Sequence, residues 1–344
     1  MISRRIVLLI AIILTISILS TGCSAIKSLL GQKDDKETLQ DELDLEDVLT
    51  EDQQDSGLRP TVLYYQDAEG YLVPVMRKIP WQEGIGKAAV TALIDEPAVR
   101  EDAQAMGLYP TIPAGAEILG LTIKDGLAKI DFNEEAFECQ NALEESNIIN
   151  SVVNTLCEFP AVDEVQFLVE GRQLDRLEHG TDISSPLKAG NLNIETSDGS
   201  FENVDEASTV TVFFHGNPTG NFTYLVPITR VVDEPVASIE TAISELIAGP
   251  KDGTGLASAI PKDTKLLGVH VDDGVVYLNF SKELMDVEEG QDIENTVLKP
   301  IVLTTKQFGN INRVKVLVEE KEWELADGSI IGDDIAVPTF INEY

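Results

Sequence analysis

The chain has 344 residues, with 60 acidic against 25 basic side chains, three cysteines and a formal net charge of −35. Nucleic-acid binding rests on Lys and Arg side chains that neutralise phosphates, so this charge argues against a nucleic-acid partner. It argues equally against electrostatic docking on anionic lipid or anionic wall polymer.

The first 22 residues predict a secretory signal. Arg4 and Arg5 precede an apolar run, Ile6–Leu19, and small residues lead to Cys23, which is the order of a signal peptide. The run is shorter than the ~20 apolar residues of a membrane span. The Gly-Cys pair resembles a bacterial lipobox, with Ser20 where Leu is usual. We expect residues 1–22 to be a lipoprotein signal peptide, Cys23 to be lipidated, and the mature chain to be extracytoplasmic and anchored to the cell membrane. The alternative is an uncleaved N-terminal anchor.

Residues 23–58 predict an acidic, disordered tether. This segment combines low hydrophobicity with a large acidic excess, so it cannot bury enough apolar surface to offset the entropy lost on ordering. A partner-binding helix at Leu43–Leu49 is the alternative interpretation.

The remaining sequence states the same pattern twice. LVPVMRKIP at 72–80 matches LVPITRVVD at 225–233, and a longer stretch at 112–137 matches 260–285. A third pair joins 162–171 to 311–320. Solenoid repeats have periods of roughly 20–50 residues, so this longer period indicates two tandem copies of one globular domain.

Each copy predicts the element order β-β-α-β-β-α-β. In the first copy these are 61–65, 71–79, 84–95, 117–123, 127–132, 143–159 and 165–169. In the second copy they are 209–214, 222–232, 237–248, 265–271, 275–280, 293–308 and 314–318. The Asp-Gly pairs at Asp125 and Asp273, each between alternating apolar residues, are typical of β-hairpin turns.

The predicted fold is α+β, with the two helices of each copy packed on a mixed, largely antiparallel sheet. Composition predicts a first domain at 59–190, a linker at 191–207 and a second domain at 208–344. Each copy lies near the modal domain size and is long enough to bury its own core.

Cysteine and histidine usage gives no sign of a disulfide or zinc site. A predicted helix separates Cys139 from Cys157, and its length exceeds the ~7 Å that a disulfide allows between Cα atoms. We therefore expect free, mostly buried thiols. His179, His215 and His270 are scattered and no CxxC pair occurs, so no metal ligands are predicted.

The stretch Leu246–Leu284 is similar to the core signature of the GerM domain family. In that signature a helix ends in Leu-x-x-Gly-Pro, an Ile-Pro pair leads into a strand, and a hairpin closes near Asn279-Phe280-Ser281. Thr155–Gly171 is similar to the next segment of the family, and the resemblance covers most of residues 60–340. The chain departs from the pattern at Asp95-Glu96-Pro97 and at Glu319-Glu320.

The resemblance implies a non-enzymatic, membrane-tethered protein of endospore-forming bacteria. Proteins of this family act between the mother-cell and forespore membranes, where they assist the assembly of a channel complex across the envelope. The resemblance also implies a role that bears on cortex formation and germination. The partners implied are therefore sporulation proteins of the envelope, together with the membrane reached through the lipid anchor.

Residues that suggest chemistry also have structural explanations. Gly84–Ala89 fits GxGxxA, but a dinucleotide site needs a strand that runs straight into it. Asp131, Glu134 and Glu135 suggest acid–base or calcium chemistry, yet the second copy has Asn279, Lys282 and Glu283 at these positions. We favour the interpretation that they are solvated charges at a strand end. We therefore predict no catalytic, cofactor-binding or metal-binding residues, and Cys23 alone is assigned a role.

Three hypotheses follow for the function. The first is assembly of envelope proteins, with sheet edges as contact surfaces. The second is a peptidoglycan-binding module in which Trp81, Tyr224 and Trp323 stack on sugars. The third is a hydrolase, which requires a clustered catalytic constellation that the sequence does not display.

Overall fold

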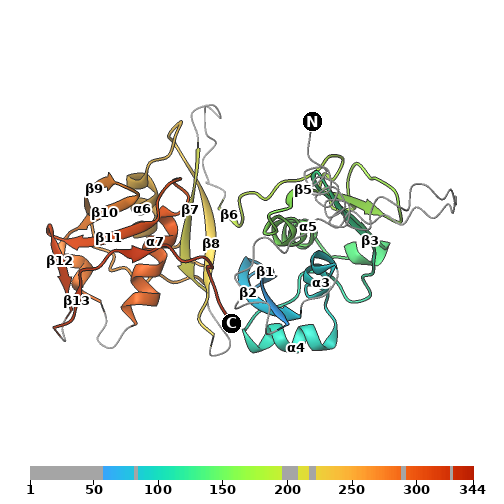
Figure 1. The fold of residues 1–344 in the computed structure, drawn as a ribbon, viewed down its shortest axis with the longest axis horizontal. Helices are drawn as coiled ribbons and strands as arrows, with labels where there is room; N and C mark the ends of the chain where they lie inside the picture. The colour runs from blue at the N-terminus through green and yellow to red at the C-terminus, as the bar shows by residue number, and fades with distance from the viewer. Residues whose placement is uncertain (1–56, 81–83, 196–207, 217–221, 288–291, 326–327) are drawn as a thin grey trace, which may run out of the picture. The chain divides into compact units, whose positions relative to one another are not determined.

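The computed structural model describes residues 57–80, 84–195, 208–216, 222–287, 292–325 and 328–344. The predicted signal peptide, Cys23 and almost all of the predicted tether lie outside these residues. All described residues belong to one unit that spans Asp44–Tyr344. Within the described residues, no helix has the length and apolar character needed to cross a membrane. Figure 1 traces the elements in chain order.

The strands of the first copy form two sheets. Strands β1 (Leu58–Gln66) and β2 (Leu72–Pro80) pair antiparallel as a hairpin. Strands β3 (Ile118–Lys124), β4 (Gly126–Phe132) and β5 (Val162–Val169) form a sheet in the order β3-β4-β5, antiparallel and then parallel. At the predicted turn Asp125 and Gly126 both have positive φ, which is the backbone that a type I′ hairpin requires.

The long helix of the first copy forms where apolar periodicity predicts it. Helix α5 (Ala142–Cys157) begins at Asn141, whose side chain accepts hydrogen bonds from the backbone N–H groups of Leu143 and Glu144. Glu144 accepts in return from the N–H of Gln140 at 2.8 Å, so unpaired donors of the first turn are satisfied by side chains. Helix α5 packs on β1 and β5.

The segment before β3 differs from the prediction. Helix α3 (Ile85–Thr91) ends four residues before the predicted boundary at Asp95, and a further helix, α4 (Pro97–Ala105), occupies the predicted connector. Pro97, which follows the helix predicted at 84–95, lies in the first turn of α4. A proline is tolerated there because the first N–H groups of a helix have no intrahelical partner.

The second copy repeats the pattern with variations in its helices. Strands β7 (Ser208–His215) and β8 (Leu225–Val232) form the hairpin, followed by helix α6 (Ile239–Ala248). The single helix predicted at 293–308 is instead a π-helical turn, Glu294–Leu298, followed by α7 (Lys299–Thr305). Pro300 has no N–H with which to continue an α-helical ladder, and this accounts for the break between the two helix types.

The last strands of the second copy extend its sheet beyond the prediction. The sheet runs β13-β12-β11-β10-β9, with β14 beside β11. Its strands are β9 (Leu266–Asp272), β10 (Val275–Phe280), β11 (Arg313–Val318), β12 (Lys321–Glu324), β13 (Ile330–Ile331) and β14 (Ile335–Ala336). Short 3-10 helices follow β4 and β10 at Glu134–Phe137 and Lys282–Met285. Helices α6 and α7 pack on β7 and on each other. The architecture is the predicted α+β fold, present twice.

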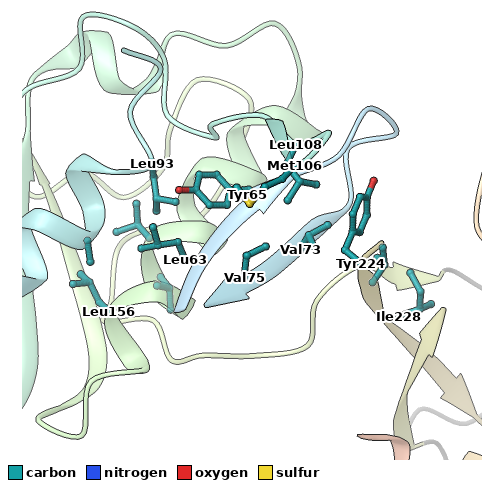
Figure 2. Close-up of a cluster of buried hydrophobic side chains, with 14 of the residues drawn as sticks. Leu63, Tyr65, Val73, Val75, Leu93, Met106, Leu108, Leu156, Tyr224 and Ile228 are labelled. Carbon is teal, nitrogen blue, oxygen red and sulfur yellow. The ribbon is translucent and has the colours of Figure 1, made fainter. Parts of the chain in front are cut away.

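The buried core continues from one copy into the other. Val73 and Val75 of β2 belong to the same buried cluster as Tyr224 and Ile228 of the second copy, and Figure 2 labels these residues together. A two-residue strand, β6 (Ile194–Glu195), lies in the segment predicted to be a linker and pairs with β8. The rest of that segment, 196–207, lies outside the described residues.

Candidate functional site

The sheet β3-β4-β5 of the first copy and the larger sheet of the second copy end in equivalent edge strands, β3 and β9. Strand β3 is the end of the order β3-β4-β5, and β9 is the end of the larger sheet of the second copy. On the outer side of each, the described part of the chain provides no pairing strand. An open edge offers backbone N–H and C=O groups to which an extended segment of another protein can add.

Each edge strand carries a β-bulge at the same position. In the first copy Ile118 pairs with Phe132 and Gly120 with Asp131, so Leu119 is skipped. In the second copy the pairs Leu266–Phe280 and Gly268–Asn279 skip Leu267. A bulge re-aims side chains and interrupts the ladder locally, so an added strand would pair along the rest of β3 or β9 and contact the redirected leucine.

The bulged leucines are exposed. Leu119 is 47% and Leu267 is 49% exposed, although leucine is a residue that proteins usually bury. Val271, further along β9, is also 47% exposed. The sequence interpretation did not single out these residues. The signal was present, because ILGL and LLGV break strict alternation just before a glycine, a pattern that indicates a bulge.

The acidic residues that suggested chemistry serve a turn instead. The Asp131 carboxylate accepts a hydrogen bond from the backbone N–H of Gly171 at 2.9 Å. In the second copy Asn279 Oδ1 accepts from the N–H of Glu320 at 2.8 Å. An amide in the second copy thus makes the same bond as the carboxylate in the first copy. The role that Asp131 and Asn279 share is therefore to hold the turn after the closing strand of each copy.

The neighbouring carboxylates are solvated. Glu134 pairs with Arg172 at 3.1 Å, and both side chains are more than 60% exposed, at 71% and 65%. Exposed pairs of this kind contribute little to stability. In the described ranges, no group of three His, Cys, Asp or Glu side chains is placed to hold a metal ion.

The glycine pattern Gly84–Ala89 is explained by helix packing. Gly84 precedes α3 with φ 79°, a conformation that favours glycine. A Cβ atom on Gly86 would lie 3.2 Å from Leu121 and 3.4 Å from Leu156. The glycine therefore allows α3 to approach β3 and α5 closely, and the helix has only seven residues.

Two of the three proposed sugar-stacking aromatics are inaccessible. Trp323 and Tyr224 are each 1% exposed, and Trp81 lies outside the described residues. A buried ring has no open face on which a sugar can stack. The histidine rings of His179 and His215 contact the backbone oxygens of Cys139 and Thr296 at 3.1 and 3.0 Å.

Cys139 and Cys157 are free thiols separated by helix α5, as predicted. Both are half-buried, whereas the sequence interpretation expected them to be mostly buried. Burial raises the pKa of each thiol, and nearby carboxylates raise it further. A raised pKa keeps the thiol protonated and unreactive.

A cavity of about 420 Å³ lies beside the end of helix α6. Arg230 lines this cavity, its side chain is 8% exposed, and it pairs with Glu195 at 2.9 Å. The guanidinium also donates to the backbone oxygens of Glu245 and Gly249, each at 2.7 Å. These carbonyls belong to the last turn of the helix, where cations are favourable. Arg230 is thus a structural cap for α6.

Comparison with known proteins agrees with this architecture. The family model described as "Germane: Sporulation and spore germination" matches residues 62–175 and 211–324. The spore germination protein GerM of Bacillus subtilis (strain 168) is 29% identical over 288 residues, which are 81% of this chain and 77% of that protein. The solved tandem GerMN domains of the sporulation protein GerM from Bacillus subtilis superpose with a TM-score of 0.69 at 27% identity, covering 83% of this chain and 99% of that one. The chain belongs to the Germane family of sporulation and spore germination proteins, as a tandem of two such domains.

Proposed function

We propose that this protein is a non-enzymatic, lipid-anchored assembly factor for the channel complex between mother cell and forespore. Membership of the family relates the chain to sporulation or spore germination. The finer role is supported by one observation above all, which is that both copies repeat an open edge strand with an exposed, bulged leucine at the same position.

Two repeated edges suit assembly better than chemistry. Partner strands that add to a sheet edge gain affinity from main-chain hydrogen bonds and specificity from side-chain contacts. A leucine at each edge supplies the apolar contact. Two such sites on one chain strengthen binding further, because the second contact is intramolecular once the first has formed. The residues that suggested catalysis or metal binding are solvated or support turns.

The lipid anchor remains part of the proposal. Lipidation of Cys23 would tether the protein outside the cytoplasm, next to the membrane where channel components assemble.

The test is co-purification from detergent-solubilised membranes of sporulating and vegetative cells. The samples are wild type, Cys23→Ala, and the double variant Leu119→Lys with Leu267→Lys. Leu143→Lys is the matched control, because Leu143 is also an exposed leucine, at 57%, but lies on helix α5.

The proposal predicts enrichment of channel components in sporulating cells with wild type and Leu143→Lys. The double variant and Cys23→Ala should each recover less. If the double variant recovers as much of the channel components as wild type does, the edges β3 and β9 are not the contact surfaces. Sedimentation with purified cell wall, without enrichment of channel components, would favour the peptidoglycan-binding alternative.

A further inference from the structure

Two short segments, one after each copy, cross over to the other copy. The first tail, Leu192–Glu195, follows the first copy, and the second tail, Ile341–Tyr344, follows the second copy. The first tail pairs in parallel with Thr229–Arg230 of β8 in the second copy. The second tail forms a parallel bridge between Glu343 and Met76 of β2 in the first copy. The tail of each copy therefore pairs with the second hairpin strand of the other copy, β8 or β2.

An asparagine side chain in the first tail ties together the hairpins of both copies. Asn193 Oδ1 accepts from the backbone N–H of Leu72 at 2.8 Å. Its Nδ2 donates to the carbonyl of Leu72 at 2.9 Å and to that of Pro227 at 2.8 Å. Leu72 belongs to β2 and Pro227 to β8, so a single amide bonds to both strands.

Asn342 of the second tail makes the same three bonds with the copies interchanged. Its Oδ1 accepts from the N–H of Leu225 at 2.8 Å. Its Nδ2 donates to the carbonyl of Leu225 at 2.8 Å and to that of Pro74 at 2.9 Å. Asn342 is 4% exposed, so these bonds form away from water, where an unpaired polar group is costly.

The repeated Leu-Val-Pro of β2 and β8 explains why an asparagine is used. Pro74 and Pro227 each offer a carbonyl but no N–H, so the strands cannot form a regular ladder with one another at these positions. The amide of each asparagine supplies both a donor and an acceptor. It therefore satisfies backbone groups that a strand partner would otherwise bond.

The exchange continues to the last residue of each tail. Glu195 of the first tail pairs with Arg230 of β8 at 2.9 Å. At the corresponding place, the Arg77 guanidinium of β2 lies 4.8 Å from the ring centroid of Tyr344. An ion pair in one half thus stands where a cation–π contact stands in the other. The position of the contact is repeated although its chemistry differs.

From this reciprocity we infer that the two copies form one rigid body and are not independent domains on a linker. We call the two exchanged tails, Leu192–Glu195 and Ile341–Tyr344, together the clasp. In an interface with two-fold symmetry, every contact from the first copy to the second is matched by the same contact from the second copy to the first. The two tails follow this rule within one chain. Exchanged tails joined by Asn193 and Asn342 hold the copies together. The clasp consequently fixes the bulged edges β3 and β9 at a constant separation and orientation.

The experiment severs the covalent connection and asks whether the halves stay together. A site for a sequence-specific protease is inserted into 196–207 of the full chain, and the purified protein is cleaved. Size-exclusion chromatography and native mass spectrometry then follow the two fragments. The clasp predicts that they remain a one-to-one complex at micromolar concentration. Separation of the wild-type fragments on cleavage would overturn the inference.

Variants locate the association in the tails. Asn193→Ala and Asn342→Ala each remove one hydrogen bond that crosses between the halves, to Pro227 and to Pro74, and two that fix the tail to its own half. Each substitution should weaken association of the cleaved halves by about tenfold, and the double variant by about a hundredfold. The matched control is Glu343→Ala, which alters an exposed side chain in the same tail. If the asparagine variants associate as tightly as this control, the tails do not form the clasp.

Hydrogen exchange on the uncut chain separates a lost clasp from a failure to fold. In the asparagine variants, exchange should accelerate at 72–77 and 225–230 while helix α5 remains protected. Unchanged exchange in both strands would count against the clasp. If a variant loses protection throughout the chain, it has failed to fold. The cleavage experiment on the wild-type protein then tests the inference, because it depends on no substitution.

Discussion

Asp67 carries a buried charge whose removal should stabilise the protein above neutral pH. Its side chain lies in the turn between β1 and β2 and is 3% exposed. Oδ1 accepts hydrogen bonds from the N–H groups of Tyr71 at 2.8 Å and Glu69 at 3.1 Å, whereas Oδ2 has no partner among the described residues. Burial raises the pKa of Asp67 from 3.8 to about 6, against the opposing effect of the bond from Tyr71.

The magnitude follows from this shift. A rise of about two pKa units corresponds to about 3 kcal/mol of penalty on the charged form in the folded state. Because the folded pKa is raised, the penalty is absent below pH 3.8, grows through pH 6 and is complete above it. Asp67→Asn keeps the acceptor oxygen and removes the charge, but it buries an unpaired NH₂ that costs about 1 kcal/mol. The variant should gain about 2 kcal/mol at pH 8 and lose about 1 kcal/mol at pH 4.

The assay is urea unfolding of residues 57–344 at pH 8, 6 and 4 for wild type and Asp67→Asn. Other titrating groups cancel in the difference between the two proteins. Asp263→Asn serves as the control, since Asp263 is exposed, and it should change stability by less than about 0.5 kcal/mol at each pH. A gain that is absent at pH 8, or that is equal at pH 8 and pH 4, would refute the reasoning.

Three further substitutions test packing and turn geometry by urea unfolding. Glu145 is 0% exposed and accepts from two backbone N–H groups of the loop 179–181, so Glu145→Ala should cost about 3 kcal/mol; a loss below about 1 kcal/mol would contradict this assignment. Glu320 has φ 65°, and Glu320→Gly should gain about 0.5–1 kcal/mol by relieving left-handed strain, whereas destabilisation would show that the turn is unstrained. A Cβ on Gly216 would lie 2.0 Å from the ring of Tyr224, so Gly216→Ala should cost about 1–3 kcal/mol, and a neutral effect would mean that the ring moves freely.

Elements governed by neighbouring residues were predicted well from sequence. The Asp-Gly turns, the alternating strands around them and helix α5 all formed where local patterns placed them. These signals depend on backbone conformation and on period, both of which are written within a few residues. The tandem duplication was equally plain, because the same signals recur in the same order.

Helix boundaries that depend on a single proline were predicted less well. The connector predicted after residue 95 contains Pro97, and in the structure this proline begins α4. Pro300 was overlooked within a helical pattern and coincides with the change from π-helical to α-helical turns. Proline fits either a helix start or a helix boundary, and tertiary packing selects between them.

The contact surface and the clasp were decided by tertiary structure. Composition placed Asn193 in a linker, since asparagine in a polar segment usually indicates a loop, yet its amide bonds to both hairpins. Tyr224 is a candidate for sugar stacking by residue type alone, but in the structure its side chain is 1% exposed. The sequence by itself determined the duplicated α+β domain and its turns, because these arise from local conformational preference. Only the tertiary structure determined which groups remain exposed at the edges and which bond across the copies, because hydrogen-bond partners more than a hundred residues apart leave no local signal.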